Sequence, residues 1–236
     1  LNRLGFKCSD INNLCDIIKL NNLNVKYIFS HLGASEDLSE IQFTESQIKL
    51  FEKISEDMEK KLNRRIDKHL LNTSGILNFS DYQYNMVRSG IGLYGFGNDY
   101  NYKSTLKPVV SLISTISQIH EIKEGESVGY NRGFIADKNT IVGIVPIGHA
   151  DGISRALGNR KGKLLVNNIP CDIIGNVCMD MLMIDISSVD CNEGDEVIVF
   201  DEEKQTAEDF SKYSDTISYE ILTSISQRIR RTYLSD

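Results

Sequence analysis

The spacing of apolar residues changes near residue 103, and this change limits the possible folds more than any other feature of the chain. Before it, apolar residues with helical periodicity alternate with short apolar runs typical of buried strands. Strands are predicted at residues 25–29, 66–71 and 85–91, and helices at residues 11–18, 44–62 and 74–79. Because strands and helices alternate, the strands should pair in parallel through right-handed crossovers. Residues 1–103 are therefore predicted to form an incomplete α/β sheet or barrel.

Residues 104–236 follow a different pattern. Runs rich in β-branched residues succeed one another and glycines separate them, which is typical of an antiparallel β domain. The runs occupy residues 109–122, 141–147, 163–166, 169–174, 182–186 and 197–200. Two short helices are predicted at residues 207–213 and 219–225, before a basic last strand. The predicted fold class is α/β plus β, with a domain boundary near residue 103.

Charge and hydropathy exclude two classes of partner. The 236 residues include 26 Lys and Arg against 33 Asp and Glu, which gives a formal net charge of -7. Such an acidic chain lacks the basic face that binds nucleic acid. The longest apolar stretch, residues 141–147, is interrupted by Gly143 and Pro146 and is too short to span a bilayer. We expect neither a nucleic acid nor a membrane as a partner.

The cysteines indicate a reducing compartment. There are five, an odd number, and no two have the two-residue spacing of a zinc knuckle or a redox motif. No export signal opens the chain. We therefore expect reduced thiols, no bound metal and a cytoplasmic protein. Since the chain begins with Leu1 rather than Met, we also expect a processed product or a fragment.

Residues 90–95 have the G-x-G-x-x-G spacing after a predicted strand. A dinucleotide fold would continue with a helix and an acidic residue about 20 positions later. Polar residues follow instead, and then Pro108, so the dinucleotide interpretation fails. The backbone N–H groups of Gly90 and Ile91 can still hold a single phosphate. Equally, the glycines can form a strand exit that binds nothing.

Three ionisable side chains lie near the ends of predicted strands. Arg88 ends an apolar run, where an unpaired charge is costly, so it either forms an ion pair or donates to a bound nitrogen or anion. His31 and His69 end two successive strands, where α/β proteins assemble their sites. A single such histidine is more often structural. Two at matching positions, with Thr73 nearby, favour a site.

A hydrolase site can be drawn from Cys178, His149 and Asp151, which lie in loops of the β domain. No local signature accompanies these residues. Cys178 also follows an apolar strand, where a buried thiol is ordinary. We therefore give the hydrolase interpretation little weight.

Ten short motifs, in this order, resemble the alanine racemase family of pyridoxal 5'-phosphate (PLP) enzymes. Each is weak alone, but their common order along the chain is specific. They are residues 2–6, 30–32, 72–74, 86–91, 93–95, 106–108, 128–130, 147–152, 178–180 and 217–220. Residues 175–181 and 219–223 also resemble the subfamily that is fused behind a cell-wall peptide ligase.

The resemblance implies a fold and an activity. The fold is the C-terminal part of a PLP-binding (β/α)8 barrel, followed by a mainly antiparallel β domain. The activity is the interconversion of L-alanine and D-alanine for peptidoglycan synthesis. The family forms homodimers in which the β domain completes the active site of the partner subunit. The small-molecule partner is therefore alanine, and the cofactor is PLP.

The resemblance also implies roles for individual residues. Tyr130 matches the tyrosine that acts as acid and base on one face of the substrate, and such a phenol, whose ordinary pKa is about 10, needs a tuned environment. Arg88 matches the arginine that faces the pyridine nitrogen and keeps it unprotonated. His31 matches the residue that supports this arginine. The other implied contacts are Thr73, Gly90, Ile91 and Tyr219 at the phosphate, Arg3 and the main chain of Met179 at the substrate carboxylate, and His149 and Arg155 at the substrate entrance.

Three departures from the family pattern change these expectations. His149 stands where tyrosine is usual, so racemisation of serine or another amino acid is an alternative. Asn176 replaces a common arginine of the access corridor. The PLP-binding lysine, the second base, belongs to the first barrel strand, upstream of Leu1. The chain alone is thus expected to be inactive, with about 125 further residues upstream; the alternative is a non-catalytic remnant that binds a partner.

Overall fold

The computed structural model describes residues 1–97 and 105–234. The chain divides into two compact units, Leu1–Lys107 and Pro108–Asp236. The domain boundary predicted near residue 103 lies outside the described residues. Each unit has its own hydrophobic core. No helix in the described ranges is long and apolar enough to cross a membrane.

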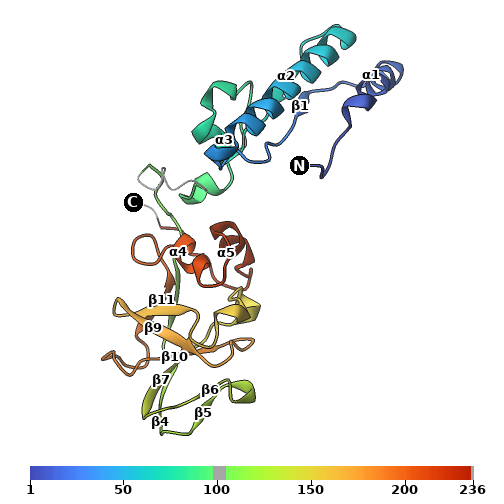
Figure 1. Cartoon of the computed structure of the whole chain (residues 1–236). Helices are drawn as coiled ribbons and strands as arrows, with labels where there is room; N and C mark the ends of the chain where they lie inside the picture. The colour runs from blue at the N-terminus through green and yellow to red at the C-terminus, as the bar shows by residue number, and fades with distance from the viewer. Residues whose placement is uncertain (98–104, 235–236) are drawn as a thin grey trace. The chain divides into compact units, whose positions relative to one another are not determined.

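The first unit alternates helices with short parallel strands (Figure 1). Its elements are α1 (Ile11–Leu20), β1 (Tyr27–Phe29), α2 (Ile41–Leu62), β2 (Asp67–His69) and α3 (Thr73–Asn78). In the parallel pair, Tyr27 lies opposite Asp67 and Phe29 lies opposite His69. The parallel pairing expected from the alternating pattern is confirmed for these two strands. Both strands point their carboxyl ends the same way, which gathers the residues that follow them at one edge.

The long helix α2 supplies one side of the core of this unit. Ile48, Phe51, Ser55 and Met58 recur at helical spacing and are buried. Ile48 and Phe51 pack in a cluster that also contains Leu32, Leu70, Leu71 and Phe79. The segments that directly follow β1 and β2 are therefore anchored by their own apolar residues. This anchoring holds the neighbouring polar residues in place.

The prediction of a third strand at residues 85–91 is wrong. The structure has a single parallel bridge there, between His69 and Met86, and a 3-10 helix at Ile91–Tyr94. The segment still lies beside β2, because the N–H of Arg88 donates to the carbonyl of Leu71 at 2.9 Å. Gly90, with φ -117° and ψ -90°, turns the chain out of the extended conformation, so the segment cannot continue to pair alongside β2.

The second unit is built on a seven-stranded antiparallel sheet (Figure 1). The strand order is β3-β11-β8-β9-β10-β7-β4. The bounds are β3 (Leu112–Thr115), β4 (Gln118–Ile122), β7 (Thr140–Val145), β8 (Lys163–Val166), β9 (Ile169–Ile174), β10 (Leu182–Asp185) and β11 (Glu196–Phe200). A separate hairpin pairs β5 (Ser127–Val128) with β6 (Phe134–Ile135). The helices are α4 (Ala207–Lys212) and α5 (Ser218–Ser224).

Two details of the β domain differ from the predicted pattern. The single run at residues 109–122 forms two strands, β3 and β4, which occupy opposite ends of the sheet order. The expected basic last strand is absent from the described residues, which contain no strand after α5. The arginines of that segment make side-chain contacts instead. Arg228 pairs with two carboxylates, and Arg231 donates to backbone carbonyls of its own turn.

Candidate cofactor and catalytic sites

Arg88 is the centre of a cluster at the carboxyl ends of β1 and β2. Its Nη2 donates to the carbonyls of Ser30 at 2.8 Å and Leu70 at 3.0 Å, the residues that immediately follow the two strands. Its Nη1 lies 2.5 Å from Nδ1 of His69, and its Nη2 lies 3.3 Å from Nδ1 of His31. The two histidines that end successive strands therefore meet on one guanidinium.

None of the four acceptors of Arg88 carries a negative charge. Burial, and then the nearby Arg88, lower the pKa of both His31 and His69. Both imidazoles are therefore neutral near pH 7, and a neutral Nδ1 can accept a hydrogen bond from the guanidinium. Burial also lowers the pKa of Arg88, but from so high a value that it remains a cation. A fixed cation with neutral acceptors can interact with an electron-rich nitrogen or an anion.

Phe29 covers one side of the cluster. Its ring stacks on the His69 imidazole with centroids 5.0 Å apart and planes inclined by 5°. The guanidinium carbon of Arg88 lies 5.7 Å from the centre of the same ring, within cation–π range. Phe29 thus restricts both side chains. The resemblance assigns no role to His69, although its position at a strand end marks it in the sequence.

Thr73 and the glycines after Arg88 form a possible phosphate cradle. The hydroxyl of Thr73 accepts from the N–H groups of Gly90 at 3.1 Å and Gly92 at 3.2 Å, so its own proton is left to donate to an anion. A Cβ at Gly92 would lie 2.9 Å from Cγ2 of Thr73, which requires glycine there. The hydroxyl of Ser74 is buried and has no hydrogen-bond partner in the described part of the chain. The proton of Thr73 and the unpartnered hydroxyl of Ser74, beside a fixed cation, fit the phosphate and ring nitrogen of PLP.

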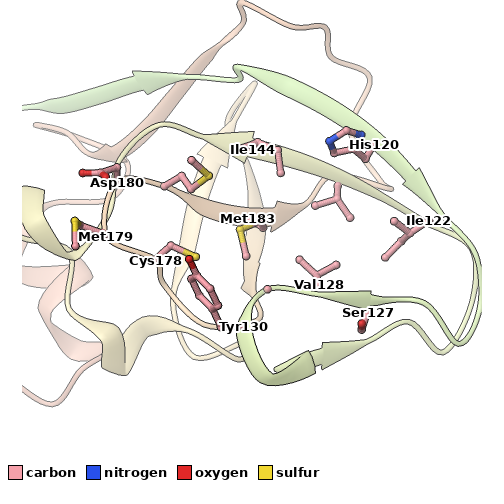
Figure 2. Close-up of a pocket in the computed structure, with 13 residues that line it drawn as sticks. His120, Ile122, Ser127, Val128, Tyr130, Ile144, Cys178, Met179, Asp180 and Met183 are labelled. Atoms are coloured by element: carbon pink, nitrogen blue, oxygen red, sulfur yellow. The ribbon is translucent and has the colours of Figure 1, made fainter.

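Tyr130 lies in the second unit, in the turn between β5 and β6. Its side chain is 75% exposed and lines a cavity of about 610 Å³. Figure 2 shows its ring directed toward Cys178, with Val128 and Met183 on the cavity wall. Met179 lines the same cavity. The structure therefore brings together the tyrosine and the methionine to which the resemblance gives catalytic and substrate-binding roles.

The loop of Met179 packs tightly against the loop of His149. The N–H of His149 donates to the carbonyl of Cys178 at 2.9 Å, and the N–H of Ala150 donates to the carbonyl of Met179 at 3.0 Å. A Cβ at Gly148 would lie 2.5 Å from that Met179 carbonyl, so only glycine allows the approach. A carboxylate only accepts hydrogen bonds, so the N–H of Met179 is the main-chain group of this residue that is suited to a substrate carboxylate.

Sequence reasoning missed the ion pairs that close these loops. Arg228 donates through Nε to Asp151 at 2.6 Å and through Nη2 to Asp180 at 2.7 Å. Asp151 is buried, and its other oxygen accepts from the N–H of Gly148 at 2.8 Å. The hydrogen bond from Arg228 is the main cause that lowers the pKa of Asp151. The basic run at residues 228–231 was the only signal in the sequence.

The same contacts bear on the hydrolase interpretation. The carboxylate of Asp151 bonds to Arg228 and to the Gly148 N–H, and the contact between His149 and Cys178 is made by backbone atoms. Both carboxylate oxygens of Asp151 are therefore engaged in holding the loop. In the described ranges, no group of three or more His, Cys, Asp or Glu side chains is arranged to hold a metal ion.

The remaining residues are divided between the two units. Arg3, Thr73, Gly90 and Ile91 belong to the first unit. Tyr219, on α5, belongs to the second unit, as do His149 and the exposed Arg155. His149 lines a second cavity of about 320 Å³, whose polar wall residues are Ser154, Ser214, Thr216, Glu220 and Ser224.

Two sequence families match the two parts of the chain. The alanine racemase N-terminal domain matches residues 1–97, and the alanine racemase C-terminal domain matches residues 109–233. The alanine racemase of Clostridium tetani is 35% identical over 248 residues, which is 100% of this chain and 63% of the relative. The alanine racemase of Helicobacter pylori strain Shi470 is 36% identical over 252 residues, covering 99% of this chain and 65% of the relative. The chain thus spans about 63% to 65% of these relatives.

Solved structures match the same extent of the chain. The alanine racemase of Bartonella henselae, described with covalently bound pyridoxal phosphate, has a TM-score of 0.85 at 30% identity and covers 99% of this chain and 64% of that one. The alanine racemase of Streptomyces coelicolor A3(2) has a TM-score of 0.90 at 26% identity and covers 100% and 64%. The predicted fold class, part of a barrel followed by an antiparallel β domain, is confirmed. The chain belongs to the alanine racemase family.

Proposed function

We propose that this chain is the C-terminal part of a PLP-dependent alanine racemase that interconverts L-alanine and D-alanine. The observation that carries the proposal is Arg88, a cation held by neutral acceptors beside the hydroxyl of Thr73. From the family we further propose a cytoplasmic homodimer that shares its active sites between subunits. It would supply D-alanine for peptidoglycan.

Several residues of this chain would hold the cofactor. When bound, PLP withdraws electrons from the α-carbon of an amino acid and makes its α-proton acidic. Arg88 would donate to the ring nitrogen and keep it unprotonated, which limits how strongly electrons are withdrawn. Thr73, with the main chain of Gly90 and Ile91, would hold the phosphate, and the resemblance adds the hydroxyl of Tyr219. His31 and His69 would keep Arg88 in place.

Tyr130 would move the proton on one face of the substrate. A phenol gives up and takes back a proton at its oxygen, and Val128 and Met183 line the cavity beside it. Arg3 and the N–H of Met179 would hold the substrate carboxylate so that the α-carbon faces the phenol. The other base would be the lysine upstream of this chain.

The replacement Tyr130→Phe tests this role in the protein expressed from the complete reading frame. We expect racemisation to fall by about 100-fold or more while PLP absorbance is retained, because general acid–base catalysis contributes about that much. Tyr233→Phe is a suitable control, since Tyr233 is 92% exposed. Activity retained in both directions in Y130F would exclude Tyr130 as a base.

A racemase of serine or another small amino acid is the second candidate. The feature that favours it is His149, which stands where the family usually has tyrosine at the substrate entrance. Comparing kcat/KM for alanine and serine in the complete protein decides between the two substrates.

The coding sequence upstream of Leu1 tests how the chain is completed. About 125 further residues with a lysine at the end of the first strand would support the racemase. A much longer extension would support a fusion behind a cell-wall peptide ligase, as in the subfamily that residues 175–181 and 219–223 resemble. A start codon directly before Leu1 would instead favour a non-catalytic, partner-binding remnant.

A further inference from the structure

The turn that carries Tyr130 is held by one side-chain amide. Asn176, in the connection between β9 and β10, donates through Nδ2 to the carbonyl of Tyr130 at 2.9 Å. Its Oδ1 accepts from Nδ2 of Asn159 at 3.2 Å. Because the Tyr130 carbonyl can only accept, the NH2 group of Asn176 must face it, which leaves Oδ1 for Asn159. One amide therefore links the tyrosine turn to a third segment.

The turn needs such support, because its backbone is in unfavourable conformations. Gly129, Asn131 and Arg132 have φ values of +76°, +56° and +51°. Two of these residues carry side chains, and residues other than glycine stay in the left-handed region only when the surroundings hold them there. The flanking strands β5 and β6 contribute only two residue pairs. The hairpin itself is thus a weak constraint on Tyr130.

Close packing around Asn176 supplies the missing constraint. A Cβ at Gly133 would lie 2.9 Å from Nδ2 of Asn176 and 3.2 Å from its backbone nitrogen. A Cβ at Gly175 would lie 2.9 Å from the carbonyl of Val128, at the other end of the turn. The N–H of Asn159 also donates to the carbonyl of Gly175 at 2.9 Å. Both ends of the turn therefore pack against residues 175 and 176.

We propose that Asn176 is a positioning residue for Tyr130, which keeps the phenol directed into the cavity. The proposal rests on the proposed role of Tyr130. An arginine, which the family commonly has at this position, offers donors only and has no acceptor for Asn159. An aspartate offers acceptors only and would face the Tyr130 carbonyl with a carboxylate. The amide alone satisfies both neighbours.

The test measures Tyr130 directly in the chain labelled with 3-fluorotyrosine. The resonance that disappears in Y130F belongs to Tyr130. We expect Asn176→Asp and Asn176→Ala to shift or broaden this 19F resonance and to leave the other tyrosines unchanged. Asn192→Ala, in the exposed loop before β11, is the matched control and should change nothing.

Kinetics of the complete protein give the second readout. We expect N176D to lower kcat by about 10-fold to 100-fold with KM for alanine within about twofold, as a misplaced catalytic group does. An unchanged resonance and kcat, with Y130F inactive, would overturn this proposal and leave the proposed function standing. Activity retained in Y130F would exclude Tyr130 as a base, on which this proposal rests, and would therefore overturn it while the proposed racemisation stands. A melting transition lost in N176D would assign Asn176 to folding and overturn the proposal.

Discussion

At the scale of single residues, the surroundings of Arg88 explain how the chain holds a partly buried cation without a carboxylate partner among the described residues. The sequence left open whether Arg88 forms an ion pair or donates to a ligand. Its acceptors are two carbonyls and two imidazoles, which are neutral because burial lowers the pKa of His31 and His69. A lowered pKa means that either imidazole becomes charged only at a pH below its usual range. There, charged imidazoles would repel Arg88, so the cluster is most stable at neutral pH and above.

His149 carries a prediction at the same scale. If its imidazole contacts the hydroxyl of a serine substrate, His149→Phe should lower kcat/KM for serine by about tenfold and leave kcat/KM for alanine unchanged, because one hydrogen bond is lost. Turnover of both amino acids by the complete protein is the measurement. His149→Tyr keeps a polar tip and should retain more serine turnover than H149F. If the ratio of kcat/KM for serine to kcat/KM for alanine is the same in H149F as in the parent, a direct contact between His149 and serine is excluded.

At the scale of elements, the residue pattern within a segment predicted some strands correctly and others wrongly. β8 and β9 occupy the residues predicted from β-branched runs, and the asparagines between them, Asn167 and Asn168, have φ of +51° and +66°, as a tight hairpin turn requires. Residues 85–91 were predicted to be a strand as well, but they form only a single bridge. Their conformation depends on the turn at Gly90 and on contacts to Leu71, which a pattern within the segment does not contain.

Long-range side-chain pairs escaped prediction for a related reason. Arg228 and Asp151 are 77 residues apart, and Asn176 and Tyr130 are 46 residues apart. Asp151 and Tyr130 lie in short 3-10 helices, and Asn176 and Arg228 lie outside helices and strands, so no strand or helix pattern in the sequence indicates which residues they contact. The family motifs located Asp151 and Tyr130, but the contacts of the other two residues became visible only in the folded chain.

The contact between Arg228 and Asp151 predicts how acid affects the β domain. The pKa of Asp151 is lowered in the folded chain, so this ion pair stabilises fully above the ordinary carboxyl pKa of about 3.9. The stabilisation is lost as the pH falls through the lowered pKa. We expect Asp151→Asn to melt at a lower temperature than the parent at pH 7, with the difference shrinking below about pH 4. Thermal melts followed by circular dichroism across this pH range are the measurement.

Arg228→Ala should also destabilise the chain at pH 7, because it leaves the buried carboxylate of Asp151 without its cation. A fall in Tm of about 5 °C is expected for a domain of this size. Arg230→Ala is the matched control, since Arg230 is exposed two positions away. Equal melting temperatures for R228A and R230A would show that the ion pair contributes nothing.

At the scale of the whole molecule, the two units have separate cores. The buried residues of the second unit include Leu164, Ile173, Val197 and Phe210, which come from three strands of one sheet and from α4. The first unit has one buried cluster on α2 and the segments after β1 and β2, and another between α1 and α2. Each core is therefore assembled from residues on one side of the division at Lys107 and Pro108.

This separation predicts that residues 108–236 fold without the first unit. The segment is of ordinary domain size, and its sheet, hairpin and two helices all lie within it. Expressed alone, it should show one cooperative thermal transition and keep the 19F resonance of Tyr130 seen in the whole chain. The matched control is the same segment carrying Ile173→Asp, which places a charge in the core and should abolish the transition. If the isolated segment melts without cooperativity, as I173D should, the second unit depends on the first for its stability.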